Sequence, residues 1–189
     1  MGTFRPSRTI IDGAGELSGK RSAHAGGAGV LSTGAGKPRI SVLTLNKMVI
    51  TTIEVDLTGL ASKNDVDDVI GLAAGGTARL TKVTAAEMGQ IYKVVMSCSE
   101  LPTASSNVGL DIDLRSGANQ ARAYDFDLSG ATSIIAAGGN WALGKTIEQL
   151  VTVPADGHAL YLTTGAAHTG DSTYTAGQLV ITLFGHKLR

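Results

Sequence analysis

Residues 90–114 read QIYKVVMSCSELPTASSNVGLDIDL, and this stretch decides the fold. Residues 90–100 are rich in β-branched and apolar side chains, which favour a strand. Residues 110–114 alternate strictly, with apolar side chains at three positions and the charged Asp111 and Asp113 between them. A period of two is typical of a strand with one face in the core and the other in water. Turn-forming residues separate the two parts, so the stretch predicts two strands of one β-protein.

The same signals recur along the chain, and they predict about eight short strands. A weak helix-start signal at residues 62–65 favours one or two helical turns over residues 66–72, and residues 84–89 predict a helical turn closed by a glycine. Short strands separated by turns, with almost no helix, indicate an all-β fold: an antiparallel, jelly-roll-like sandwich. The remaining predicted strands lie at residues 49–57, 121–128, 133–137, 146–153, 159–163 and 178–185.

The first 47 residues differ from the rest. The 189-residue chain has no net charge, but residues 1–47 carry seven basic residues against Asp12 and Glu16, a net of +5, which leaves −5 for the remainder. This part is rich in glycine and lacks sustained periodicity, so alone it cannot bury enough surface to offset its ordering entropy. We expect an extended N-terminal arm at residues 1–47 and a β-sandwich body at residues 48–189. Within the arm, residues 40–45 could add a strand to a sheet edge, its own or a partner's.

The cysteine content and hydropathy of the sequence indicate in which cellular compartment the protein is expected. Cys98 is the only cysteine, so no intramolecular disulfide can form, and its apolar strand predicts a buried, inert thiol. No apolar run approaches the roughly 20 residues that a membrane-spanning helix needs. The basic N-terminus has no continuous apolar core behind it, so no secretory signal is predicted. We expect a soluble protein made in the cytosol, with no membrane partner.

Catalytic and cofactor signatures are scarce. Gly19 and Lys20 match part of a phosphate-binding loop, but Arg21 stands where a hydroxyl residue should hold magnesium, and no strand precedes the motif. None of the four histidines has metal-ligand spacing to another or to Cys98. No serine lies in a nucleophile-elbow context, and the basic residues are too sparse for a nucleic-acid face. The sequence therefore predicts no catalytic residue, no cofactor and no nucleic-acid partner.

Two pairs of aspartates raise the possibility of a calcium site. Asp111 and Asp113 are expected on one strand face, and Asp125 and Asp127 on another, and calcium takes six to eight oxygen ligands. The alternative is a solvated outer face whose charges keep sheets from pairing edge to edge. Because no calcium-loop glycine pattern accompanies the pairs, the sequence favours the solvated face and predicts no metal.

The order of motifs over residues 48–185 resembles a family of phage proteins. The motifs are IEVDLTGL at 53–60, DVIG at 68–71, the glycine pair at 75–76, TAAEMG at 84–89, MSCSELP at 96–102, DIDL at 111–114 and YTAG at 174–177, ending in an apolar strand that runs to residue 185. These resemble capsid decoration (cement) proteins of tailed, often marine, bacteriophages. The resemblance does not include the arm.

That resemblance implies a structural virion protein rather than an enzyme. A jelly-roll body, commonly a homotrimer, would sit on the outer surface of an icosahedral head after synthesis in the host cytoplasm. The arm would cross neighbouring subunits of the major capsid protein and staple them, and at about 3.3 Å per extended residue it is long enough to do so. The residues expected to contact the capsid are four arginines and four apolar anchors: Arg5, Arg8, Arg21 and Arg39, with Ile10, Ile11, Val30 and Leu31.

Two other function classes remain open. The chain could be a ligand- or carbohydrate-binding β-sandwich module of a phage tail or fibre, for which Trp141, Tyr161 and Tyr174 are the loop or edge aromatics that could stack on a sugar. Trp141 has a second interpretation, as a plug over one end of the core. An enzyme on a β-scaffold is disfavoured because the expected constellation of site residues is missing.

Overall fold

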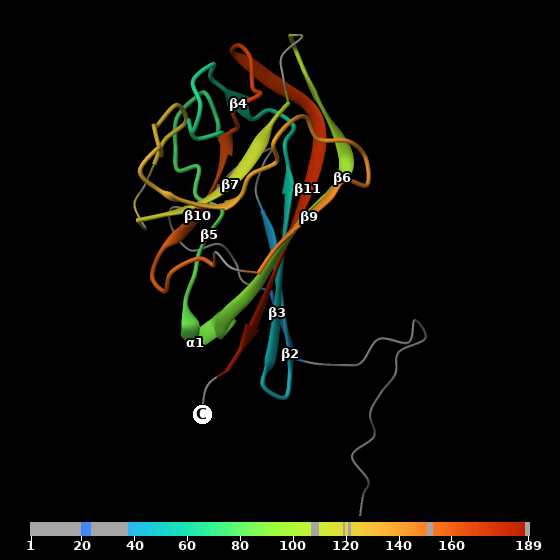
Figure 1. Ribbon diagram of the computed structural model, residues 1–189, viewed down its shortest axis with the longest axis vertical. Coiled ribbons are helices and arrows are strands. Elements are labelled where there is room, and N and C mark those ends of the chain that lie inside the picture. The colour runs from blue at the N-terminus through green and yellow to red at the C-terminus, as the bar shows by residue number, and fades with distance from the viewer. Residues whose placement is uncertain are drawn as a thin grey trace, which may run out of the picture.

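The computed structural model describes residues 20–23, 38–106, 110–118, 120, 122–150 and 153–187. Within these ranges the chain forms strands and one short helix (Figure 1). The elements are β1 (Lys20–Ala23), β2 (Arg39–Leu45), β3 (Met48–Asp56), β4 (Ala61–Ser62), β5 (Thr81–Lys82), α1 (Ala85–Met88), β6 (Gln90–Ala104), β7 (Ile112–Gly117), β8 (Thr132–Ile135), β9 (Thr146–Gln149), β10 (Ala159–Thr164) and β11 (Ser172–His186).

Eight of these strands form a jelly roll. β3, β11, β6 and β9 are neighbours in the larger sheet, and β5, β10, β7 and β8 are neighbours in the smaller one. Every pairing is antiparallel. In chain order the strands pass repeatedly between the two sheets, which is the double-sheet arrangement of a jelly roll. Figure 1 shows the larger sheet to the right and the smaller one to the left. The predicted all-β sandwich is confirmed.

The main core lies between the two sheets. It includes Ile53, Met96, Leu114, Leu160 and Ile181, and none of these has any exposed surface. For Ile53, Met96 and Leu114 the period of two in the sequence indicated the inner face correctly. Burying each side chain of this size contributes about 1.5–3 kcal/mol.

The end of the predicted arm belongs to the larger sheet. β2 and β3 form a hairpin whose turn contains Asn46 in the left-handed conformation, with a φ of 55°. The expected boundary between arm and body, after residue 47, coincides with this turn. β1 pairs with β2 in turn, so residues 39–45 add a strand to the protein's own sheet.

The outer face of the smaller sheet is covered by the protein's own loops. Ala159 and Tyr161 of β10 pack there against Val69 and Ala78, from the segment between β4 and β5, and against Leu128, from the segment between β7 and β8. These five side chains form a second, smaller apolar cluster. The face of this sheet that the sequence predicted to be in contact with water is therefore buried under the protein's own loops.

Three local predictions are wrong, for identifiable reasons. Residues 122–128 form a turn with one isolated β-bridge instead of a strand, because Asp125 has a φ of 66° and breaks the extended path. Residues 66–72 form no helix, since Asp67 has a φ of 71° and the chain makes single bridges to neighbouring segments. β9 ends at Gln149, short of the predicted residue 153. The helical turn before Gly89 is confirmed as α1.

Candidate functional site

Two of the eight predicted capsid-contact residues fall on described strands. Arg39 is exposed at the start of β2, opposite Glu54 of β3. Arg21 lies in β1, where its backbone is opposite Leu43. The others, Arg5, Arg8, Ile10, Ile11, Val30 and Leu31, lie outside the described residues. The Gly19-Lys20 motif leads into a strand, since Lys20 begins β1.

The larger sheet presents a broad outer face of half-exposed side chains. One row across it runs Leu43, Ile50, Phe184 and Lys93, from β2 to β6, with each pair directly opposite in register. The Lys93 ammonium lies 5.2 Å from the centre of the Phe184 ring and 2.6 Å from a carboxylate oxygen of Glu148 on β9. The row combines apolar surface with a single ion pair at its margin.

A second row on the same face is less apolar. Thr52, Thr182 and Val95 are opposite one another on β3, β11 and β6, and all are half-exposed. Threonine and β-branched apolar residues suit a flat pleated surface. We call the two rows together the outer sheet face. It extends from β2 to β6, with β1 beyond β2 on one side and β9 beyond β6 on the other.

Large exposed apolar side chains gather along the β6–β9 margin of the same sheet. Tyr92 and Leu101 of β6 are 47% and 46% exposed, while Leu143 and Leu150, on either side of β9, are 69% and 59% exposed. Since β9 has β6 as its only neighbour in the sheet order of the described strands, this margin is an open sheet edge. Such edges are sites where another chain can pair.

The first pair of aspartates considered as calcium ligands, Asp111 and Asp113, is buried and accepts hydrogen bonds from backbone amides. Asp111 and Asp113 are only 1% and 6% exposed, which contradicts the predicted solvated face. An oxygen of Asp113 accepts a 2.7 Å hydrogen bond from the Ala137 amide, and an oxygen of Asp111 accepts a 2.9 Å bond from the Ala167 amide. Burial raises the pKa of Asp113, and the Ala137 amide opposes that shift. Among the described residues, no three histidine, cysteine, aspartate or glutamate side chains group as a metal site would require.

Asp68 lies beside the second aspartate pair. It is 4% exposed, and its backbone bridges to Asp127. Burial is the main cause that raises the pKa of Asp68 to about 6, and the nearby charges of Asp125, Asp65 and Asp127 add to it. Asp127 shows the opposite behaviour, because hydrogen bonds from the backbone and hydroxyl of Ser129 lower its pKa. Neighbouring carboxyls thus differ in how readily they bind a proton.

The aromatics suggested for sugar stacking are not on the surface. Tyr161 and Tyr174 are fully buried in β10 and β11, which contradicts their placement on loops or edges. Burial raises the pKa of the Tyr174 hydroxyl to about 12. Trp141 is 3% exposed and its indole N–H donates a 2.8 Å bond to the Ile112 carbonyl. Its interpretation as a core plug is confirmed, as is burial of the Cys98 thiol, whose pKa is raised by desolvation.

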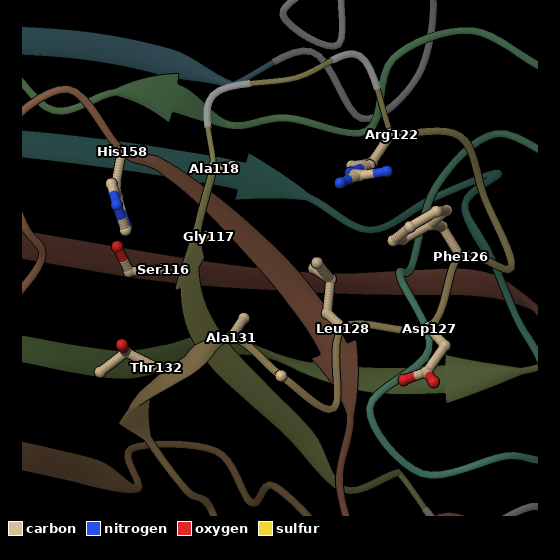
Figure 2. A pocket seen from close by; sticks show the side chains of 11 residues that line it. Ser116, Gly117, Ala118, Arg122, Phe126, Asp127, Leu128, Ala131, Thr132 and His158 are labelled. Carbon is tan, nitrogen blue, oxygen red and sulfur yellow. The ribbon is translucent and has the colours of Figure 1, made fainter.

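A pocket of about 360 Å³ opens at the end of β7 (Figure 2). Arg122, Phe126 and Leu128 lie on one side of Gly117, whereas Ser116, Thr132 and His158 lie on the other. The Arg122 guanidinium stacks on Phe126, 3.9 Å from the ring centre. Sequence reasoning missed this site because its residues come from β7, the β7–β8 segment, the start of β8 and the turn before β10, with no fixed spacing between them.

Comparisons of the chain with protein-family models, curated proteins and solved structures found no match. Within the described parts of the chain, the helix α1 has four residues, and no helix is long and apolar enough to cross a bilayer. The features of the molecule that bear on its function are the outer sheet face, the N-terminal segment and the pocket.

Proposed function

We propose that this protein is a capsid decoration protein, a non-enzymatic structural component of a phage virion. It binds the outer surface of the head as an oligomer, after synthesis in the host cytoplasm. Its partners are the major capsid protein and further copies of itself, most simply as a homotrimer. The resemblance of residues 48–185 to decoration proteins supports this, and so does the jelly-roll topology.

The observation that carries the proposal is the difference between the two outer faces of the sandwich. The smaller sheet is covered by its own loops, which bury Val69 and Leu128 against it. The larger sheet instead presents half-exposed Leu43, Ile50 and Phe184 in one continuous row. An apolar centre bordered by charged residues such as Arg39 and Glu148 is typical of a protein interface. We assign this outer sheet face to contact between copies.

The N-terminal segment joins the body at the edge of this face. β1 and β2 extend the larger sheet beyond β3, so Lys20, the residue that follows positions 1–19 in the chain, lies at the rim of the proposed oligomer interface. Their basic residues, Arg5 and Arg8, would meet an acidic coat surface, and Ile10 with Ile11 would provide apolar anchors. Several copies of the arm in one oligomer multiply weak contacts by raising their effective concentration.

A deletion of residues 1–19 tests the proposal and leaves β1 and the body intact. Full-length and shortened proteins would be mixed with undecorated heads of the phage that carries this gene, and binding would be followed by cosedimentation. We expect the full-length protein to saturate the heads and the shortened one to remain in the supernatant, with the same oligomeric state in native mass spectrometry. Saturation by the shortened protein would refute the stapling role, and failure of the full-length protein to bind would refute the capsid role.

The alternative is a ligand- or carbohydrate-binding module of a tail or fibre. The three aromatic residues suggested for sugar stacking are buried in the core, so they cannot serve that function. The pocket at the end of β7 is the feature that favours it. Binding of the protein to purified tails but not to heads, in the same cosedimentation, would select the alternative.

A further inference from the structure

The open edge of β9 carries backbone groups that face away from the sheet. The Cys98 amide of β6 donates a 2.9 Å hydrogen bond to the carbonyl just before β9, so Cys98 directs its backbone toward β9. Backbone groups point alternately to the two sides of a strand, so every second residue of β6 does the same. Ile147 and Gln149 lie opposite such residues and bond to β6. The amide and carbonyl of Glu148, which lies between them, therefore point to the open edge.

The charges of this margin and of the nearby end of the sheet complement a segment with both signs of charge. Glu148 is exposed at the margin, and because a carboxylate accepts hydrogen bonds at both oxygens, it can bind a second cation besides Lys93. Lys47, in the β2–β3 turn, and Lys187, just after β11, are exposed at one end of the larger sheet. The Lys187 amide donates a 2.7 Å bond to the Lys47 carbonyl, so the two lysines are adjacent. We call this pair the basic end.

One part of the N-terminal segment matches this order of charges. Residues 7–16 read SRTIIDGAGE. Arg8 is followed by a β-branched run at residues 9–11, which favours a strand, and Asp12 and Glu16 lie between that run and β1. A chain that leads back from β1 would therefore bring two carboxylates past the basic end, and then bring Arg8 and the strand-forming run to the margin.

The chain between β1 and this run is long enough to reach β9 of the same copy. Lys20, at the start of β1, lies opposite Thr44, close to the β2–β3 turn. Five strand spacings separate β1 from β9, which amounts to about 24 Å. The extended chain from Ile11 to Lys20 spans up to about 30 Å, and the glycines among residues 12–19 allow it to turn.

We propose that residues 7–19, which we call the return segment, fold back on their own copy in the free protein. Residues 12–19 pass the basic end, and residues 7–11 add to β9 as a short strand. This strand is parallel to β9, because β9 ends nearer to the basic end than it begins. Docking in the free protein does not require a capsid role. On a phage head, the return segment would leave the margin and cross to the coat.

This arrangement provides partners for the exposed groups of the margin. Arg8 pairs with Glu148, and Ile10, two residues further on and on the same face, covers the side chain of Leu150, which is 59% exposed. The outward amide of Glu148 donates to a carbonyl of the added strand. Because an open edge strand is a template for pairing with other chains, the return segment keeps free copies from joining edge to edge.

Amide hydrogen exchange, followed residue by residue by NMR without phage heads, tests the proposal. The full-length protein is compared with the protein that lacks residues 1–19. We expect the Glu148 amide to exchange at least about tenfold more slowly in the full-length protein. The amides of Ile147 and Gln149, which bond to β6, should exchange equally in both. Equal exchange of the Glu148 amide in the two proteins overturns the proposal.

A mixing experiment shows whose return segment is bound. Isotope-labelled protein that lacks residues 1–19 is refolded together with unlabelled full-length protein. We expect the labelled Glu148 amide to exchange as fast as in the shortened protein alone, because each return segment binds its own copy. Slow exchange of the labelled amide would place the strand on a neighbouring copy and overturn the assignment to the same copy.

Variants of the chain locate the contact. Ile10→Asp should abolish the slow exchange of the Glu148 amide, whereas Phe4→Asp, outside the return segment, is the matched control and should retain it. Lys187→Glu reverses a charge of the basic end beside the acidic part of the return segment, so it should speed the exchange several-fold, as should raised salt. Slow exchange that persists in Ile10→Asp would show that another segment covers the edge, and would overturn the proposal.

Discussion

Arg115 and Asp67 form an ion pair that joins β7 to the segment between β4 and β5. The two side chains are 13% and 15% exposed, so the pair is largely shielded from water. Arg115 also donates a 3.3 Å hydrogen bond to the carbonyl of Ala131, just before β8. One guanidinium thus contacts both segments that cover the smaller sheet.

Replacement of Asp67 should therefore destabilise the protein. Asp67→Asn keeps the size of the side chain and tolerates the left-handed backbone at this position, but it leaves Arg115 buried without its counter-charge. Removing one partner of a shielded pair is costly, and we expect the free energy of unfolding to fall by about 2–3 kcal/mol. Urea denaturation followed by circular dichroism measures it.

Lys63→Gln is the matched control, because it breaks the Lys63–Asp171 ion pair on the surface. Exposed pairs contribute little to stability, so its effect should be much the smaller of the two. Equal losses in both variants would contradict a special role for Arg115.

Stability should also depend on the protonation of Asp68. Burial and the neighbouring carboxylates raise its pKa in the folded protein to about 6, from 3.8. The folded state therefore binds the proton more tightly than the unfolded state, so the contribution of Asp68 to stability is full below pH 3.8 and is lost as pH rises through 6. Asp68→Asn, which stays neutral, should be more stable than the wild type at pH 7 by about 1–3 kcal/mol and lose this advantage near pH 4.

Urea unfolding at several pH values between 4 and 7 measures this dependence. Glu100→Gln, an exposed carboxyl on β6, is the control and should follow the wild-type profile. A constant difference between Asp68→Asn and the wild type across this range would show that Asp68 is not the group that titrates.

Gly165 is required by the buried carboxylate of Asp111. A Cβ at position 165 would lie 2.4 Å from Cγ of Asp111, so Gly165→Ala must displace a carboxylate that accepts the Ala167 amide. We expect a loss of about 2–4 kcal/mol, typical of overpacking combined with a broken buried hydrogen bond. Thermal unfolding followed by circular dichroism measures the loss. Gly130→Ala is the control, because a Cβ there meets nothing within 4 Å, and its stability should stay close to that of the wild type.

Trp141→Phe should separate the contribution of the indole N–H from that of the ring. The variant loses the 2.8 Å bond to the Ile112 carbonyl and leaves that buried acceptor unpaired. We expect a decrease of about 1–3 kcal/mol in the free energy of unfolding, with the fold retained by circular dichroism. An unchanged stability would show that the N–H hydrogen bond contributes little and that burial of the ring accounts for the role of Trp141.

The sequence predicted what depends on local pattern. Alternation placed Ile53 and Met96 in the core, and the turn residues separated the strands well enough to indicate a jelly roll. The same rule failed at Asp111 and Asp113, because alternation cannot show that distant loops will cover the polar face. The pocket was beyond prediction for a similar reason, since its lining residues come from β7, β8 and the segments beside β8 and β10, which lie together only in the folded smaller sheet.

The outer sheet face gives the last prediction, which concerns assembly. Ile50 lies at its centre, half-exposed between Leu43 and Phe184. Ile50→Glu should fold, since its side chain points away from the core, but it places a charge at the middle of the proposed contact between copies. Central interface residues often contribute 2 kcal/mol or more, so the dissociation constant of the oligomer should rise by about 30-fold or more.

Native mass spectrometry over a dilution series would measure that constant, with Leu143→Glu as the control. Leu143 is 69% exposed beside β9 and lies off the outer sheet face. Dissociation of the Ile50→Glu oligomer, with Leu143→Glu unchanged, would assign assembly to the face. The reverse result would assign assembly to the β6–β9 margin. That margin is an open sheet edge flanked by exposed leucines, and a second copy can pair with such an edge.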